Sequence, residues 1–174
     1  LPFKPIALAD RPRIEPLLRA SALPLCEYTF ATQFCWSEYN GTEWSVLDDR
    51  WLLIRYAEDG REKFLWPVGE GDATPALAWC DEHLRSRGHL PTIGFVPEVA
   101  RGIAEAAGWR ATADPDEADY CYARSDLVDL SGGHYSRKRN HIKRFVSAGP
   151  WTFGPVDVSA TDECLDFLRE WCRV

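Results

Sequence analysis

The sequence predicts an α/β protein, more closely an α+β arrangement in which helices pack on a mixed β-sheet. Two observations lead to this fold class. Segments with helical periodicity alternate with segments rich in β-branched and aromatic residues, in the order β-α-α-β-β-β-α-β-α-β-β. The 174 residues are also 45% hydrophobic and 13% aromatic, which is enough apolar material for a buried core.

The N-terminal part predicts one strand and two helices. Residues 3–8 favour a short strand. Residues 10–21 favour a helix with Asp10 as N-cap, and Pro16 is expected to make it short or kinked. A second helix over residues 26–40 ends at the glycine that follows it.

The middle of the chain predicts an antiparallel meander followed by a helix. The β-rich segments are residues 43–49, 50–60 and 61–69, separated by Asp-Asp and Asp-Gly, which are typical of hairpin turns. Residues 72–88 then favour a helix with Asp72 at its N-cap and a closing glycine.

The next elements are expected to complete the sheet. Residues 91–96 predict a buried strand, and residues 97–108 a helix that begins at a proline and ends at a glycine. Residues 109–114 and 118–124 predict two more strands, joined by an acidic loop. In the second of these, Tyr120 and Tyr122 alternate and share one face, where they either line a pocket or fill the core.

The C-terminal part predicts one more strand, residues 151–158, and one more helix, residues 160–172. One strand and one helix cannot bury a core of their own. We therefore expect three regions. They are a first domain at 1–133, a basic linker helix at 134–150, and the beginning of a second, truncated domain at 151–174.

The segment SGGHYSRKRNHIKRF, residues 131–145, is basic in an acidic chain. The whole sequence has 20 Lys and Arg against 27 Asp and Glu, a net charge of -7. This balance disfavours general adhesion to DNA or to an anionic membrane, so we expect anion binding to be local to this segment. Its cations are Arg137, Lys138, Arg139, Lys143 and Arg144.

Helical geometry divides this segment into two faces if Ser136 is the N-cap. One stripe carries Arg137, Asn140, His141 and Arg144. The opposite side, which we expect to face a core, carries Ile142, Phe145 and Val146. Among the polar residues, His141 is a candidate catalytic base, and a solvated surface histidine is the alternative; no other catalytic residue is predicted.

Two glycines before the helix allow backbone N–H groups to turn toward an anion at the positive end of the helix dipole. The candidate phosphate- or substrate-binding residues are therefore Gly132, Gly133, Arg137, Lys138, Arg139, Asn140, Lys143 and Arg144. In the alternative interpretation, the cations pair with acids of the same protein, such as Asp119, Asp126 or Asp129.

The cysteines and the hydropathy point to a cytoplasmic protein without a metal. No CxxC pair is present, so we expect buried free thiols of a reducing compartment and no zinc site. No apolar run approaches the ~20 residues of a membrane span, and no secretory signal is visible. The cysteines are Cys26, Cys35, Cys80, Cys121, Cys164 and Cys172.

The order of the first eleven elements resembles the GNAT acyltransferase fold, which holds acyl-CoA where its fourth strand splays from its fifth. Its pyrophosphate loop, Q/R-x-x-G-x-G/A, is similar to WPVGEGD, in which Gly69 and Gly71 fit the glycines. Trp66 stands where Gln or Arg is expected, and Glu70 and Asp72 oppose a bound anion. CoA is therefore less expected than a tight strand-to-helix turn, and Trp66 is a candidate for ligand stacking.

A longer segment, DYCYARSDLVDLSGGHYSRKRNHIKRF, with the later EWC, resembles the phosphatidylglycerol lysyltransferase C-terminal-like family. The resemblance implies two tandem GNAT-like domains, aminoacyl-tRNA as donor, contact with the tRNA acceptor end, and a lipid, peptide or small-molecule acceptor. Two other functions remain open: an acetyl-CoA-dependent N-acetyltransferase, and a non-catalytic GNAT-like module that binds a phosphorylated ligand.

Overall fold

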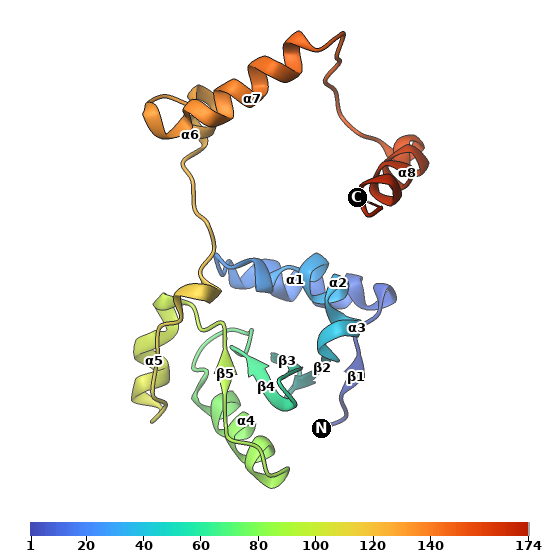
Figure 1. Cartoon of the computed structure of the whole chain (residues 1–174). Coiled ribbons are helices and arrows are strands. Elements are labelled where there is room, and N and C mark those ends of the chain that lie inside the picture. Colours follow the sequence, from blue (N-terminus) through green and yellow to red (C-terminus); the bar gives the residue numbers. More distant parts are fainter. Residues whose placement is uncertain (174) are drawn as a thin grey trace. The chain divides into compact units, whose positions relative to one another are not determined.

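The computed structural model describes residues 1–173. The chain forms two compact units, Leu1–Tyr120 and a second unit that begins at Cys121 (Figure 1). Unit 1 contains a five-stranded mixed sheet with helices around it, which confirms the expected α+β class. Within residues 1–173, no helix combines the length and the apolar composition needed to cross a membrane.

The sheet has the strand order β1-β2-β3-β4-β5. Strands β1 (Lys4–Pro5), β2 (Glu43–Leu47), β3 (Trp51–Glu58) and β4 (Arg61–Leu65) pair with their neighbours in antiparallel fashion, as the meander predicts. Strand β5 (Ile93–Gly94) lies parallel to β4. Helix α4 (Thr74–Ser86) connects β4 to β5, and a parallel pair needs such a crossover.

The Asp-Gly turn between β3 and β4 sets the register of that hairpin. Glu58 pairs with Arg61, so the loop has two residues. Asp59 and Gly60 both have positive φ, 50° and 71°, which is the signature of a type I′ turn. This turn matches the twist of the strands and is favoured by Asp-Gly, so the local sequence alone predicts it correctly.

Helices flank the sheet of unit 1. They are α1 (Arg11–Ser21), α2 (Phe30–Cys35), α3 (Ser37–Asn40), α4 (Thr74–Ser86) and α5 (Arg101–Ala106). Single 3₁₀ turns join many elements of the chain: Leu8–Asp10, Cys26–Tyr28, Glu98–Ala100, Pro115–Glu117, Gly133–Tyr135 and Val158–Ala160.

Asp10 does not cap α1 through its side chain, contrary to the prediction. Its carboxylate instead accepts hydrogen bonds from Lys4 Nζ at 2.6 Å, the Ala7 N–H at 3.0 Å and Trp44 Nε1 at 3.1 Å. Because the Asp10 carboxylate bonds these partners and not the first N–H groups of α1, it links the N-terminal segment to Trp44 on β2. Helix α1 also runs through Pro16 for its full 11 residues and is not shortened.

The core lies between the sheet and its helices. Strand β3 is its centre, with Leu52, Leu53 and Ile54 at most 2% exposed. Phe64 from β4 and Leu77 from α4 close the core on the neighbouring elements. At about 25 cal/mol per Å² of buried apolar surface, such side chains supply the main stabilising term of unit 1.

Three expected strands, at residues 109–114, 118–124 and 151–158, do not form, so those predictions are wrong. The first two regions hold irregular backbone and a 3₁₀ turn, and Arg124 begins a helix instead. A strand needs a neighbour whose backbone groups it can pair with. Strand β5 offers only two residues, half-buried rather than buried, and the next residue, Phe95, leaves the strand conformation with φ 52°.

Unit 2 consists of helices α6 (Arg124–Asp129), α7 (Ser136–Ser147) and α8 (Thr161–Trp171). Helix α7 follows a 3₁₀ turn, so Ser136 is its first residue and not its N-cap. The apolar side of α7 does not face a core among the described residues. Its exposed fractions are 52% at Ile142, 65% at Phe145 and 44% at Val146.

Candidate functional site

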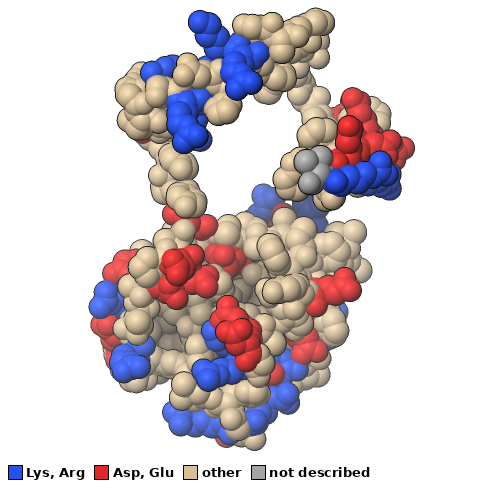
Figure 2. Space-filling view, in the orientation of Figure 1, with Lys and Arg blue, Asp and Glu red and all other residues tan. Residues whose placement is uncertain are grey.

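Four cations of α7 have no acidic partner within the described part of unit 2. Arg137, Lys138, Lys143 and Arg144 are exposed, and within the described part of unit 2, residues 121–173, none of them lies within 4.0 Å of a carboxylate oxygen. Figure 2 shows the basic side chains along this helix. Within unit 2, neither Asp126 nor Asp129 forms an ion pair with these cations.

Arg139 plays a different part from its neighbours. Its Nη1 donates to the Gly132 carbonyl oxygen over 2.8 Å and also to the Leu130 carbonyl oxygen. Leu130 ends α6 with φ 46°, and Gly132 has φ 86°, a conformation that a side chain would strain. Arg139 thus fixes the diglycine loop from α7, through backbone carbonyl groups rather than through an anion.

The diglycine loop leaves donors unused. The N–H groups of Gly132 and Gly133 donate to no residue that the structure describes. Asn140 and His141 are exposed on α7, and their side chains likewise form no hydrogen bond or ion pair within the described part of unit 2. Two amide donors, four cations without an ion pair in unit 2 and a polar stripe therefore lie on one short stretch, where anion binding stays a prediction.

The glycines of the WPVGEGD loop serve internal packing. A Cβ on Gly69 would lie 2.5 Å from Trp51 Cε3, and a Cβ on Gly71 would lie 2.2 Å from Arg50 Nη2. Arg50 Nε donates to the Glu70 carbonyl oxygen over 2.7 Å. The close approach of Arg50 and Trp51 thus accounts for both glycines without a ligand.

Asp72 occupies the start of α4. Its Oδ1 accepts a hydrogen bond from the Thr74 N–H over 3.0 Å, but the N-cap residue of α4 is Ala73, so Asp72 lies one residue before the predicted position. This hydrogen bond is the largest cause of the lowered pKa of the Asp72 carboxyl. A carboxylate of the chain therefore holds a donor that a bound phosphate would use at a helix N-terminus. This arrangement disfavours a pyrophosphate at this loop.

A cavity of about 430 Å³ lies in unit 1 where β4 and β5 diverge. Trp66, Phe95 and Trp109 give it aromatic walls, and acidic and basic side chains line its rim. Trp66, the predicted stacking residue, is thus placed at a cavity. Gly69 and Gly71 are not among its lining residues, and neither are the tyrosines Tyr120 and Tyr122, which are 90% and 53% exposed.

The Tyr28 hydroxyl bridges β4 and β5 just beyond the point where their pairing ends. The ladder of β4 and β5 ends at Leu65 and Gly94. One residue further, the Tyr28 hydroxyl accepts from the Trp66 N–H over 3.2 Å and donates to the Phe95 carbonyl oxygen over 2.7 Å. Burial raises the pKa of this phenol, so it stays a neutral donor and acceptor. The hydroxyl takes the place that a ligand amide would need between the strands.

Tyr56 is the second tyrosine that sequence reasoning missed. It is 8% exposed, lines the cavity, and its hydroxyl donates to no described residue. Gly94 makes room for it, because a Cβ there would lie 2.0 Å from the hydroxyl oxygen. The alternation of β3 predicts burial for Tyr56, but only the pairing of distant elements places its hydroxyl at a cavity.

A comparison with protein families shows the family of this chain. Residues 19–174 match the family described as "Phosphatidylglycerol lysyltransferase, C-terminal". The chain belongs to this family. The expected resemblance, based on the basic segment and on EWC, is thereby confirmed.

A solved structure is similar to this phosphatidylglycerol lysyltransferase C-terminal family member over nearly its whole length. It is the crystal structure of a conserved protein of unknown function from Bacteroides thetaiotaomicron VPI-5482, with a TM-score of 0.83 and 33% sequence identity. The alignment covers 99% of this chain and 60% of that one, so the chain spans 60% of the length of its relative. No match was found among curated proteins.

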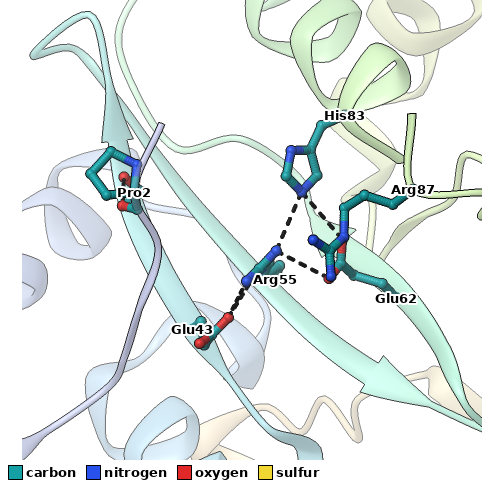
Figure 3. A network of polar contacts seen from close by, with 7 residues as sticks. Pro2, Glu43, Arg55, Glu62, His83 and Arg87 are labelled. Carbon is teal, nitrogen blue, oxygen red and sulfur yellow. Dashed lines mark hydrogen bonds and ion pairs between the residues drawn. The ribbon is translucent and has the colours of Figure 1, made fainter. Parts of the chain in front are cut away.

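A polar network in this family member joins the sheet to α4 (Figure 3). Arg55 on β3 bonds Glu43 on β2 over 2.8 Å and Glu62 on β4 over 3.1 Å. His83 Nε2 and Arg87 Nε each lie 3.3 Å from the remaining Glu62 oxygen, which is buried and receives no well-aligned hydrogen bond. Burial lowers the pKa of His83. The network cross-links elements of the fold.

The cysteines are mostly not buried, contrary to the prediction. Only Cys80 is buried, and the others are exposed. One ligating atom each from Cys26, Glu27 and Asp119 lie within 4.8 Å of one another. The Cys26 thiol donates to Glu27 Oε1, and burial together with both carboxylates raises its pKa to about 12. A cation could be held there only after this thiol loses its proton.

Proposed function

We propose that the protein is an aminoacyl- or acyl-transferase of the tandem GNAT-like type. In this proposal it moves an amino acid from aminoacyl-tRNA to a lipid, peptide or small-molecule acceptor. The observation that carries it is the set of four unpaired cations on α7, in a chain that belongs to the phosphatidylglycerol lysyltransferase C-terminal family.

The order of elements supports a GNAT-like core in unit 1. Four antiparallel strands are followed by a helix and by a fifth strand parallel to the fourth, and this is the order from which the GNAT-like fold is expected. The cavity lies where these last two strands part, which is where that fold holds its acyl group. Fold alone does not name the substrate, so the donor must be argued from the residues.

The residues favour a donor other than CoA. Asp72 holds the Thr74 N–H at the start of α4, and the Tyr28 hydroxyl fills the gap between β4 and β5. Acyl-CoA could bind there only if Asp72 released the Thr74 N–H and the Tyr28 side chain moved out of the gap. The unpaired cations lie elsewhere, on α7, where they suit a polyanionic carrier such as the phosphates of a tRNA end.

In the proposed reaction, an acceptor amine or hydroxyl attacks the carbonyl carbon of the aminoacyl ester. A new amide or ester bond forms, the bond to the terminal ribose oxygen of the tRNA breaks, and the acceptor's proton passes to that oxygen. No cofactor is required for this balance. The protein would contribute by positioning both reactants and stabilising the negative charge that develops on the carbonyl oxygen.

Transfer from charged tRNA tests the proposal directly. The protein is incubated with aminoacyl-tRNA and with separate lipid, peptide and small-molecule acceptors, and the acylated product is measured. We expect transfer to one acceptor class and a large loss in Arg137→Ala/Arg144→Ala. The matched control Arg61→Ala/Arg124→Ala removes two exposed arginines that have no ion pair within residues 1–173 and should keep the rate.

Two results would count against the proposal. If the wild type deacylates the aminoacyl-tRNA no faster than Arg137→Ala/Arg144→Ala does, the two α7 arginines have no role in the reaction. Binding of tRNA without any turnover would favour the alternative of a non-catalytic module that recognises a phosphorylated ligand.

A further inference from the structure

The ring nitrogen His83 Nε2 on α4 lies close to two groups of opposite charge (Figure 3). It is 3.3 Å from Arg55 Nη1 and also 3.3 Å from Glu62 Oε1. An arginine guanidinium only donates hydrogen bonds, so its bond to Nε2 requires this nitrogen to be without a proton. A bond from Nε2 to the carboxylate requires the proton to be present. Through Nε2, His83 therefore bonds one of these two neighbours at a time.

The structure has the arrangement of a neutral His83. Glu62 Oε1 is buried and receives no hydrogen bond from the described residues, although His83 Nε2 and Arg87 Nε each lie 3.3 Å from it. Nε2 therefore accepts from Arg55, and the single ring proton belongs on Nδ1. Burial is the largest cause of the lowered pKa of His83; the Glu62 charge opposes it, and the charges of Arg55 and Arg87 add to it. A buried carboxylate oxygen without a donor costs free energy, so the neutral arrangement leaves one group unsatisfied.

The N-terminal segment, residues 1–6, packs against this histidine through Phe3. The centroid of the Phe3 ring lies 5.7 Å from that of the His83 ring and 4.5 Å from the guanidinium carbon of Arg55. Trp79, one turn before His83 on α4, stacks on the imidazole at 4.8 Å and also contacts Phe3. Strand β1 follows Phe3 and pairs with β2 through two residues alone. Since so short a strand adds little, the position of the segment depends on the site where Phe3 packs.

We propose that His83 is a proton-sensitive latch that holds the N-terminal segment on the sheet. When Nε2 has no proton, Arg55 donates to it, and the Phe3 ring packs against both side chains. When Nε2 gains a proton, it donates to Glu62 Oε1 and no longer accepts from Arg55. The imidazolium and the guanidinium then repel each other, the packing site of Phe3 changes, and the segment opens. This property goes beyond the proposed function, because transfer does not require it.

The direction of the pH dependence follows from the pKa of His83. In the closed arrangement this pKa lies below the ordinary value of 6.5, whereas a ring exposed by opening titrates near that value. The closed form is therefore fully stable above the ordinary value and loses stability as the pH falls from there toward the folded pKa. Asp10, which pairs with Lys4 on β1, has a pKa below 3.8 and stays ionised at about pH 5. The charged groups that face His83 and its partner Arg55 from the packed elements are Arg55 on β3, Glu62 on β4, Glu43 on β2 and Arg87 at the end of α4.

Amide hydrogen exchange, followed by NMR on the whole protein, tests the latch. The probe is the Ile6 N–H, which donates to the Thr42 carbonyl oxygen over 3.2 Å just after β1. After correction for the intrinsic exchange rate, we expect its protection to fall about tenfold from about pH 8 to about pH 5, the value of one hydrogen bond to a charged group. His83→Gln keeps an oxygen acceptor for Arg55 but takes up no proton, so it should lose this dependence. The matched control His89→Gln replaces a histidine outside the network and should keep it.

A second measurement needs no variant. The ¹⁵N chemical shifts of the His83 ring in the wild type show which nitrogen carries the proton, and at about pH 8 we expect it on Nδ1 and not on Nε2. The proposal is overturned if Nε2 carries the proton there, if the protection of the Ile6 N–H does not change with pH, or if His83→Gln keeps the wild-type dependence. None of these results bears on transfer from aminoacyl-tRNA, so the latch and the proposed function fail separately.

Discussion

The Tyr28 hydroxyl donates a hydrogen bond to the Phe95 carbonyl oxygen over 2.7 Å and so joins the 3₁₀ turn Cys26–Tyr28 to the end of β5. The Tyr28 hydroxyl oxygen also accepts a hydrogen bond from the Trp66 N–H, just after β4. One side chain therefore satisfies two backbone groups that the parting strands would otherwise leave without a partner. This relationship leads to the first prediction.

Replacing Tyr28 by phenylalanine should destabilise unit 1. The ring keeps its place in the core, but the Trp66 N–H and the Phe95 carbonyl lose their partner in a buried environment. We expect a loss of about 1–3 kcal/mol in the free energy of unfolding, measured by urea denaturation. Tyr39→Phe removes a hydroxyl from a side chain that is 84% exposed and should change little. Equal stability of Tyr28→Phe and the wild type would contradict the bridging role.

CoA should give no saturable heat of binding with the wild-type protein. The reason is that Asp72 holds the Thr74 N–H and that Arg50 and Trp51 fill the space beside the two loop glycines. Calorimetric titration with CoA checks this. Saturable heat that is lost in Gly71→Ala would show instead that the loop binds the cofactor.

Arg139→Ala should loosen the diglycine loop. Its Nη1 is the donor that holds the carbonyl oxygens of Leu130 and Gly132. We expect faster amide hydrogen exchange at residues 130–133, followed by mass spectrometry, while Lys138→Ala, which removes a neighbouring cation without such bonds, should leave the exchange unchanged. Equal exchange in both variants would assign no clamping role to Arg139.

Acid should weaken unit 1 partly through Asp10. The pKa of this carboxyl lies below its ordinary value of 3.8, and the hydrogen bond from Lys4 is the largest cause. A carboxyl whose pKa is lower in the folded state adds stability above its unfolded pKa and loses it as the pH falls through the folded value. Urea denaturation from about pH 6 to about pH 3 should therefore show a smaller loss of stability in Asp10→Asn than in the wild type. A parallel loss in both proteins would contradict this.

Local chemistry made part of the fold predictable. The Asp59-Gly60 turn, the glycine that ends α3 and the helices at α4 and α5 all follow from residues within a few positions of one another. The expected strands at 109–124 failed because pairing depends on a neighbour, and β5 is too short to provide one. Pattern alone cannot reveal how long a distant partner will be.

The candidate site likewise contains residues that the sequence reveals and residues that it does not. The basic segment was visible in the sequence because its charges are contiguous, although the separate role of Arg139 depends on where the carbonyl oxygens of the loop lie. The sequence could not reveal Tyr28 and Tyr56, because their hydroxyls meet Trp66, Phe95 and Gly94 only through the packing of elements that are far apart in the chain, 67 residues for Tyr28 and Phe95. Asp10 was assigned a local cap because its true partner, Trp44, is remote.

The salt dependence of tRNA binding tests the central claim, that the cations of α7 are free to neutralise phosphates. The dissociation constant is measured at several salt concentrations for the wild type, Arg137→Ala/Arg144→Ala and Arg61→Ala/Arg124→Ala. We predict that removing the two α7 arginines lowers the slope of log affinity against log salt by about 1.4–1.8, while the control keeps the wild-type slope. Identical slopes for all three proteins would contradict the account.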